Sequence, residues 1–565
     1  MHDFAALYAE LDASTATGDK VDALVRYFAR AAASEPADAA WAVYFLAGGK
    51  PQQRVPTSVL REAACREAGI DAWLFEECYQ AVGDLAETIA HVLPPGVPAA
   101  RRGLADWMHE RVLPLRGLPP AEQQARLAAA WRELDARGRF LFVKLIGGGF
   151  RVGVSRLLVQ RALAQHTGLD AQLLAQRLVG WTDARALPDA SRWHALVAPP
   201  GQGSAPAGQP YPFFLAHALQ ADPATLGEPA EWLVEWKYDG IRAQVVRRGG
   251  QCWIWSRGEE LVTERFPEVV AAAAAWPEGT VLDGELLVWP DAADRPAPFQ
   301  TLQQRLNRKT LPKKLLADAP VAFVAYDLLE SDGSDRRSEP QAARRARLEA
   351  LQAAQPALRV SPLVPALAWP DWAAARATAR ERGVEGLMLK HRAARYGSGR
   401  TKADGVWWKW KVDPLSVDAV LVYAQAGHGR RASVYTDYTF AVWSRPPHDA
   451  AEAAAVVEAI AQRVPPPALE SGALQLLPFA KAYSGLSDEE FKAVDRVIRG
   501  TTVNQFGPVR SVRPTLVFEI GFEGIGASPR HKSGVAVRFP RMLRLRPDKP
   551  LHEADTLGGL QALIG

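Results

Sequence analysis

The chain has 565 residues, too many for one ordinary hydrophobic core, so roughly two to four domains are expected. Its 48% hydrophobic and 23% charged residues are typical of a globular protein, and no apolar run of about 18 residues predicts a membrane span. The net charge is only +4 and excludes little by itself.

The basic charge is unevenly distributed along the chain. Residues 101–161 hold 12 Lys and Arg against 5 Asp and Glu, and residues 501–549 hold 9 against 3. Two basic regions favour a polyanionic partner, although solvated surface faces would give the same counts.

The cysteines and the first residues bear on the cellular compartment. Cys65, Cys78 and Cys252 are scattered without a CxxC pair, which argues against a disulfide framework and against a four-cysteine zinc site. The opening "MHDFAALYAELDAS" lacks the basic start and apolar core of a signal peptide. We therefore expect a cytoplasmic protein, and the Ala-, Arg- and Pro-rich composition suits a GC-rich bacterial genome.

Residues 1–196 are predicted to form an all-α domain. Apolar residues recur there at spacings of three and four, and "RVPTSVLREAACREAG" has a helix start at Thr57 or Ser58 and a glycine stop at Gly69. The next stretch, 197–212, reads "VAPPGQGSAPAGQPYP" and is predicted to be a linker.

Residues 213–412 are predicted to form an α+β domain. Two alternating runs flank Gly249 and Gly250 in "AQVVRRGGQCWIWSR", a hairpin signal, and "GTVLDGELLVWP" and "VAFVAYDLLE" read as strands. Strands dominate again in 413–565, where a small β-barrel of the OB-fold type is expected, with one inserted helix, "SDEEFKAVDRVIRG".

The stretch "EWKYDGIR", 235–242, places Lys237 inside an apolar and aromatic run. A lysine is a nucleophile only as the neutral amine, so reaction near neutral pH needs its pKa of about 10.4 depressed by roughly 3 units. Taken alone, a solvated lysine at a strand end explains this stretch at least as well.

Further segments follow in order: "SRGEE" (256–260), "LDGELL" (282–287), "FVAYDLLE" (323–330), "EGLMLK" (385–390), "WWKWK" (407–411) and "RFPRMLRLRPDK" (538–549). Each alone could be an ordinary strand. Together and in this order they resemble the covalent nucleotidyltransferases, and most closely the ATP-dependent DNA ligases. The helical half resembles the N-terminal DNA-binding domain of the larger ligases, so the resemblance covers nearly the whole chain.

The resemblance implies a role for each matching residue around the nucleotide. Lys237 would attack the α-phosphate of ATP and carry AMP. Glu235 would read the adenine amino group, and Tyr326 would stack on the adenine, a position that is often phenylalanine in relatives. Arg242 and Arg257 would contact the bound nucleotide and the nick phosphates.

Other matching residues would hold charge and metal. Glu285 would hold the ribose or a metal, and Glu385 would help to bind the catalytic Mg²⁺ or Mn²⁺. Lys409 and Lys411 alternate along one strand, so both would reach the α-phosphate.

Arg546 and Lys549 of "RPDK" match barrel residues that would fold over the active site and orient the leaving pyrophosphate. The implied protein is a monomer that closes as a clamp around nicked double-stranded DNA at the nucleoid. An RNA ligase or a capping-type nucleotidyltransferase is the alternative, and a non-catalytic nucleic-acid-binding scaffold is a third possibility that the intact motifs disfavour.

Overall fold

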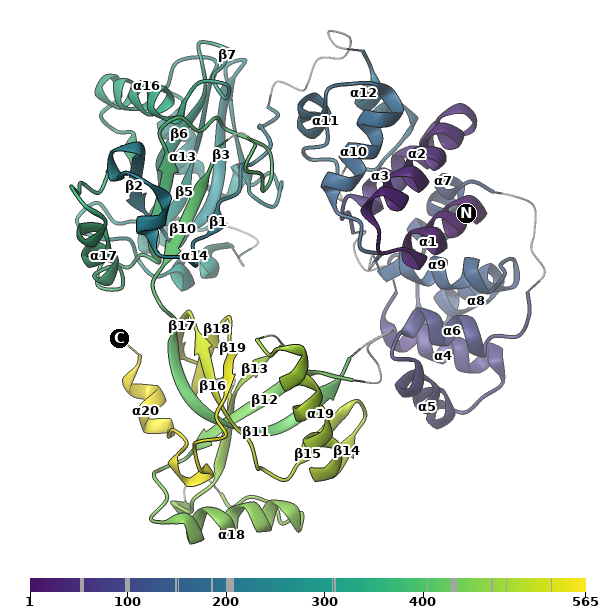
Figure 1. Ribbon diagram of the computed structural model, residues 1–565. Helices are drawn as coiled ribbons and strands as arrows, with labels where there is room; N and C mark the ends of the chain where they lie inside the picture. Colours follow the sequence, from purple (N-terminus) through teal and green to yellow (C-terminus); the bar gives the residue numbers. More distant parts are fainter. Residues whose placement is uncertain are drawn as a thin grey trace. The chain divides into compact units, whose positions relative to one another are not determined.

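The computed structural model describes residues 1–50, 55–96, 102–147, 150, 152–183, 186–199, 208–306, 308, 311–403, 405–427, 434–468, 471–483, 485–529 and 531–564 (Figure 1). They divide into two compact units: residues 1–56, 97–126 and 133–412 form the first, and residues 57–96, 127–132 and 413–565 form the second. Half of the predicted linker, at 200–207, lies outside the described residues, and the predicted domain boundaries stay predictions.

The N-terminal part of the chain is helical, as the apolar spacing predicted. Its α-helices are α1 (His2–Ala13), α2 (Thr17–Ser34), α3 (Pro36–Leu46), α4 (Thr57–Ala68), α5 (Ala72–Val82), α6 (Leu85–Val92), α7 (Leu104–Asp106), α8 (Pro120–Arg132), α9 (Ala136–Gly147), α10 (Arg156–Thr167), α11 (Ala171–Arg177) and α12 (Ala190–Val197). The π-helix Trp107–Val112 follows α7 directly.

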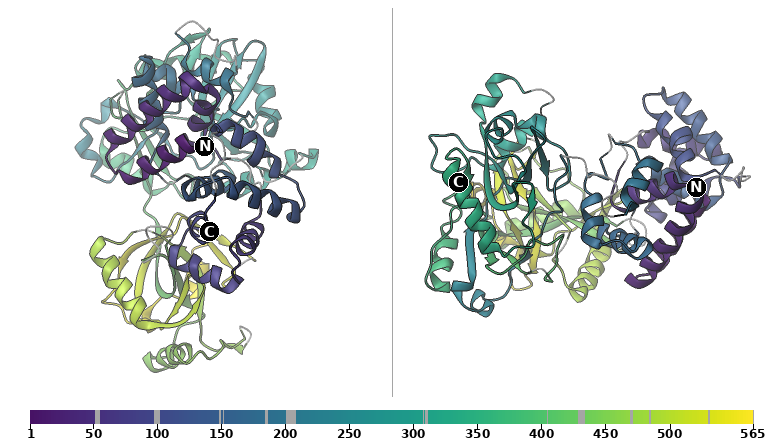
Figure 2. Two further views of the ribbon diagram at one scale, coloured as in Figure 1. Left: turned by 90° about the vertical axis from the view of Figure 1, so that its right-hand side faces the viewer. Right: turned by 90° about the horizontal axis from the view of Figure 1, so that it is seen from above.

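One face of α2 shows why these helices associate. Val21, Leu24, Phe28 and Ala31 recur at helical spacing and are buried, and α2 packs against α1, α3 and α10 (Figures 1 and 2). No helix among the described residues is both long enough and apolar enough to cross a membrane.

Residues 213–412 contain two β-sheets. The larger has the order β4-β3-β5-β6-β7, with β8 parallel to β6, and the smaller has the order β1-β10-β9-β2. The strands are β1 (His217–Ala218), β2 (Trp232–Trp236), β3 (Ile241–Arg248), β4 (Gln251–Ser256), β5 (Thr280–Val288), β6 (Val321–Ser331), β7 (Ser334–Asp335), β8 (Arg359–Val360), β9 (Gly386–His391) and β10 (Trp407–Lys411). The helices are α13 (Pro267–Ala273), α14 (Phe299–Leu306), α15 (Lys313–Asp318), α16 (Gln341–Ala354) and α17 (Trp369–Ala377).

The predicted hairpin is confirmed. β3 and β4 pair in antiparallel register up to Arg248 and Gln251, and the turn residues Gly249 and Gly250 have φ of 57° and 72°. Two successive positive φ angles are what a tight two-residue hairpin turn requires, and glycine adopts them without steric cost.

Among the described residues of the second unit, seven strands form one curved sheet, and β17 and β18 pair separately (Figure 1). β11 pairs with β12 along one edge, and along the other with β16 and then β15. The elements are β11 (Leu415–Ala426), β12 (Tyr435–Trp443), α18 (Ala450–Ala461), β13 (Leu476–Ala482), α19 (Asp488–Thr501), β14 (Thr502–Phe506), β15 (Val509–Val512), β16 (Val517–Phe522), β17 (Gly524–Ala527), β18 (Val535–Arg538), β19 (Arg541–Leu545) and α20 (Leu557–Ala562).

The helix predicted in this strand-rich part is confirmed as α19. Its N-cap, Ser487, accepts from the backbone N–H of Glu490, whose carboxylate accepts from the backbone N–H of Ser487 in return. Val494 and Ile498 of this helix are buried in the core of the curved sheet, so the helix belongs to the domain.

Candidate active site

Lys237 lies just beyond the end of β2 and is joined to Glu385 twice. Its backbone N–H donates to the carbonyl of Gly386 over 2.8 Å, and the backbone N–H of Glu385 donates to the carbonyl of Lys237 over 2.7 Å. The side chains meet as well: Lys237 Nζ donates to Glu385 Oε2. The strand ladder therefore places the predicted nucleophile and the predicted metal ligand side by side.

A second lysine reaches the same carboxylate from β10. Lys411 Nζ lies 3.3 Å from Glu385 Oε2. Lys411 is the register partner of Gly386, where a Cβ atom would lie 2.3 Å from the carbonyl oxygen of Trp410. Glycine at 386, with φ of 134°, is what lets β9 and β10 approach this closely.

Lys409 shares the strand face of Lys411, and other cations surround it. Burial lowers the pKa of Lys409, and the positive charges of Lys411, Lys237, Arg400 and Arg257 lower it further. A lysine held among this many cations suits a ligand with several negative charges, such as a triphosphate.

Arg242 is fixed on β3 by a buried carboxylate that the sequence analysis left unassigned. Asp283, fully buried on β5, accepts from Arg242 Nε over 3.1 Å and from Nη2 over 2.7 Å, and from the hydroxyl of Tyr396 over 2.6 Å. The backbone N–H of Arg257 donates to the carbonyl of Arg242, so the two predicted nucleotide-contacting arginines are neighbours.

Glu285 lies opposite Arg242 in the register of β3 and β5. Its Oε1 accepts from the backbone N–H of Gly240 over 3.2 Å. Burial raises the pKa of Glu285 to about 7, while the nearby charges of Lys237 and Arg242 act in the opposite direction. Glu285 and Glu385 therefore both lie within electrostatic reach of Lys237.

Glu235 is buried and engaged on both carboxylate oxygens. Oε1 accepts from Arg345 of α16 over 2.8 Å, and Oε2 pairs with Lys390 of β9 over 2.7 Å. Lys390 Nζ also donates to the carbonyl of Tyr326 over 2.9 Å and lies 4.5 Å from the centre of the Tyr326 ring. The two residues predicted to recognise adenine are thus connected through Lys390.

Four residues that contact the predicted site residues had no role predicted from the sequence: Asp283, Arg345, Lys390 and Tyr396. Asp283 and Lys390 lie inside the segments "LDGELL" and "EGLMLK", so the sequence pattern that carries the family resemblance could have indicated both residues. Arg345 lies in an arginine-rich helix and Tyr396 in a loop, and neither position had a distinguishing pattern.

Arg546 and Lys549 belong to the second compact unit. Both pair with Asp418 of β11. Arg546 Nη1 lies 3.0 Å from each carboxylate oxygen, and Lys549 Nζ lies 2.6 Å from Oδ2.

Among the described residues, no group of three or more His, Cys, Asp or Glu is arranged to hold a metal ion.

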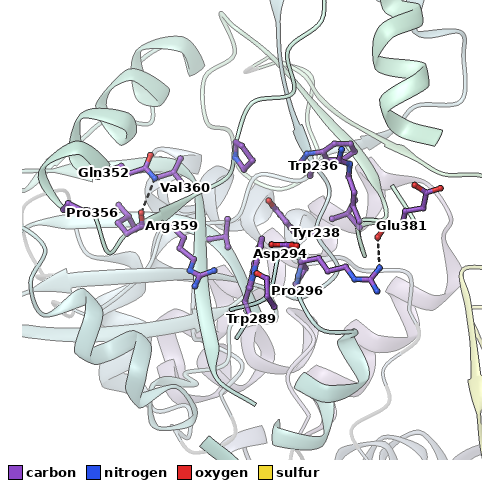
Figure 3. Close-up of a pocket in the computed structure, with 17 residues that line it drawn as sticks. Trp236, Tyr238, Trp289, Asp294, Pro296, Gln352, Pro356, Arg359, Val360 and Glu381 are labelled. Carbon is purple, nitrogen blue, oxygen red and sulfur yellow. Dashed lines mark hydrogen bonds between the residues drawn. The ribbon is translucent and has the colours of Figure 1, made fainter. Parts of the chain in front are cut away.

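A cavity of about 870 Å³ lies beside the end of strand β2 (Figure 3). It is lined by Trp236, Tyr238 and Trp289, with Arg359 and Arg382 beside the tryptophan rings. Trp236 and Tyr238 alternate with Glu235 and Lys237, so they face away from the lysine. None of the predicted site residues lines this cavity.

Comparison with known families decides the class. The ATP-dependent DNA ligase domain matches residues 214–411, the DNA ligase N terminus matches 1–164, and the ATP-dependent DNA ligase C-terminal region matches 468–549. A probable DNA ligase of Anaeromyxobacter sp. (strain K) is 32% identical over 90% of this chain and 95% of its own length. The chain belongs to the ATP-dependent DNA ligase family.

Other relatives agree with this assignment. A probable DNA ligase of Opitutus terrae is 31% identical to this chain over 99% of its length, and the chain spans 62% of the length of that relative. The solved structure named Pmar-Lig_Pre covers 96% of the chain with a TM-score of 0.60 at 14% identity, a likeness of fold. The predicted order of an all-α region, a nucleotidyltransferase domain and a strand-rich C-terminal domain is confirmed.

Proposed function

We propose that this ligase seals nicks between a 5′-phosphate and a 3′-hydroxyl in duplex DNA through a lysyl-AMP intermediate on Lys237. The supporting observation is the contact of Lys237 with Glu385, whose carboxylate Lys411 shares. A reactive amine beside a carboxylate and among further cations has the groups that nucleotidyl transfer needs.

The first step forms the enzyme–AMP bond. The lone pair of the neutral Lys237 amine attacks the α-phosphorus of ATP, and Nζ gives up one proton to solvent as the P–N bond forms. The bond to the β-phosphate oxygen breaks, and pyrophosphate leaves. Glu385 orients Nζ, while Lys409 and Lys411 offset the charge on the phosphate in the transition state. Arg546 and Lys549 orient the leaving pyrophosphate.

The next two steps transfer AMP and close the strand. An oxygen of the DNA 5′-phosphate attacks the phosphorus of lysyl-AMP, and the P–N bond breaks to free Lys237. The 3′-hydroxyl then attacks the DNA 5′-phosphate and loses its proton to solvent, while the pyrophosphate bond to AMP breaks and AMP leaves. Arg242 and Arg257 contact the nucleotide and nick phosphates, Glu235 recognises the adenine amino group, and Tyr326 stacks on the base.

A divalent cation, Mg²⁺ or Mn²⁺, fits the carboxylates of Glu285 and Glu385. Two protein carboxylates completed by phosphate oxygens and water suit Mg²⁺, which is seldom held by an all-protein cage. When bound, it would polarise the phosphate oxygens and offset their charge. Lys237 lies within electrostatic reach of both carboxylates, which supports this pairing.

The basic residues of 101–161 and 501–549 would hold the duplex, and a monomer would close around it as a clamp. The three cysteines are free in the described structure, which suits a reducing cytoplasm and work on chromosomal DNA in replication, repair or recombination.

A gel assay tests the proposed function. A labelled nicked DNA duplex should be sealed with ATP and a divalent cation, and should stay open when NAD replaces ATP. Sealing of nicked RNA but not of DNA, or an adduct formed with GTP rather than ATP, would contradict the proposal and favour the RNA-directed alternative.

A further inference from the structure

A single buried carboxylate gathers the two cations of the "RPDK" segment. Asp418 has a side chain that is 11% exposed, and both of its oxygens lie 3.0 Å from Arg546 Nη1. Lys549 Nζ donates to Asp418 Oδ2 over 2.6 Å. No other carboxylate contacts Lys549 among the ion pairs of the described residues.

Asp418 itself is held by a strand ladder and by backbone hydrogen bonds. It lies within β11, in register with Glu519 of β16, and its backbone exchanges hydrogen bonds with Asp555: the N–H of Asp418 donates to Asp555 Oδ2 over 2.7 Å, and the N–H of Asp555 donates to the carbonyl of Asp418 over 2.8 Å. Arg546 and Lys549, by contrast, lie in the turn that follows β19.

The pairing holds Arg546 along two edges of its guanidinium group. Nη1 faces Asp418, while Nε donates to Asp548 Oδ1 over 3.0 Å and Nη2 donates to Asp548 Oδ2 over 2.9 Å. Asp548 is 64% exposed, so solvent screens that pair, and Asp418 is the fixed partner. Lys549 has three N–H donors and Asp418 takes one, which leaves donors for phosphate oxygens.

Two long side chains lose rotamer freedom when they bind a ligand from a disordered state, and that loss weakens binding. A shared carboxylate on a strand imposes that order before the ligand arrives, and it keeps both cations close together.

We propose that Asp418 is a positioning residue for the adenylation step, which holds Arg546 and Lys549 as one unit that receives the pyrophosphate end of ATP. This inference rests on the proposed function, in which those cations orient pyrophosphate. It assigns to Asp418 a role that no sequence motif gave it.

The test separates the adenylation step from the later steps in Asp418→Asn protein. Three rates are measured: formation of lysyl-AMP from labelled ATP, its reversal by added pyrophosphate, and sealing of a nick that already carries the 5′-adenylate. We expect the first two to fall about tenfold or more, because misplaced groups forfeit orientation, and the third to stay at the wild-type rate.

Glu519→Gln is the matched control, since Glu519 lies opposite Asp418 and pairs with Arg544 at 2.7 Å. It should leave all three rates near those of the wild type. In an Arg546→Ala/Lys549→Ala background, Asp418→Asn should cause no further loss of adenylation, whereas a residue that only stabilises the fold would lower all rates in any background.

Three outcomes would overturn the inference: normal or faster adenylation in Asp418→Asn, an equal loss in all three rates, or an additive loss in the double-variant background. If Asp418→Asn does not fold, Asp418→Glu keeps the charge but moves it by one methylene. That variant should also be slowed in adenylation alone, and full adenylation would contradict the inference. A wild-type protein that forms no adduct would instead reject the proposed function itself.

Discussion

Lys237 donates a hydrogen bond through Nζ to the Oε2 atom of Glu385. The contact depends on the antiparallel ladder between β2 and β9, and the backbones of the two residues also pair just beyond its end. A carboxylate in this position can orient the amine and can also bind a cation, and the second role gives a prediction about metal.

Glu385→Ala should raise the divalent-cation concentration that half-saturates self-adenylation, by about 10- to 100-fold, because the site loses a hard oxygen ligand. The measurement is a Mg²⁺ titration of lysyl-AMP formation. Glu381→Ala is the control, since its side chain is exposed four residues earlier in the same loop. An unchanged titration in Glu385→Ala would argue against a metal role.

The lowered pKa of Lys409 predicts how the rate of self-adenylation changes at alkaline pH. Its pKa is lowered from 10.5 by burial and by neighbouring cations. The ammonium charge is therefore present below the lowered pKa and is lost as pH rises through it, before an ordinary lysine would titrate. The adenylation rate should fall with a midpoint below 10.5. Lys409→Arg should move that fall to higher pH because a guanidinium stays protonated. The same midpoint in both proteins would contradict this role.

Removing the buried carboxylate of Asp283 should strongly destabilise the folded protein. Asp283→Ala leaves the guanidinium of Arg242, only 15% exposed, without its carboxylate, and should lower the free energy of unfolding by about 3 kcal/mol. Urea denaturation measures it. The control is Asp291→Ala, which breaks an exposed pair with Arg359 and should cause no measurable change. Equal stability of the two variants would contradict the account of this buried pair.

The N-terminal basic region predicts a change in salt dependence. A triple glutamine variant removes exposed arginines from it: Arg116, Arg137 and Arg161. Nick affinity should fall, and the slope of log K against log salt should decrease by about 0.9 for each lost phosphate contact. Self-adenylation without DNA should not change. Substituting Arg26 and Arg347, which are exposed outside the basic regions, should leave the slope unaltered; an unaltered slope in the triple variant would remove the proposed role.

Features encoded by local sequence were predictable. The Gly249–Gly250 hairpin follows from backbone sterics, and the alternation of Lys409 and Lys411 follows from the period of a strand. The domain order was predicted from a set of segments whose order along the chain resembles that of a known family.

Pairings between distant residues were not predictable from one sequence. Arg345 reaches Glu235 across 110 positions, and Arg546 reaches Asp418 across 128. A buried carboxylate must find a partner, but the chain holds 67 Lys and Arg, and periodicity does not say which of them the fold will deliver. The roles given to the site residues stay predictions until such variants are measured.

The central claim is that Lys237 carries AMP. The direct measurement incubates the protein with α-labelled ATP and a divalent cation, and then follows label that remains on the protein in acid. Wild type and Lys314→Ala, in which an exposed lysine is removed, should form the adduct. Lys237→Ala and Lys237→Arg should form none, because neither side chain offers a neutral amine. An acid-stable protein–AMP adduct in either Lys237 variant would contradict the account.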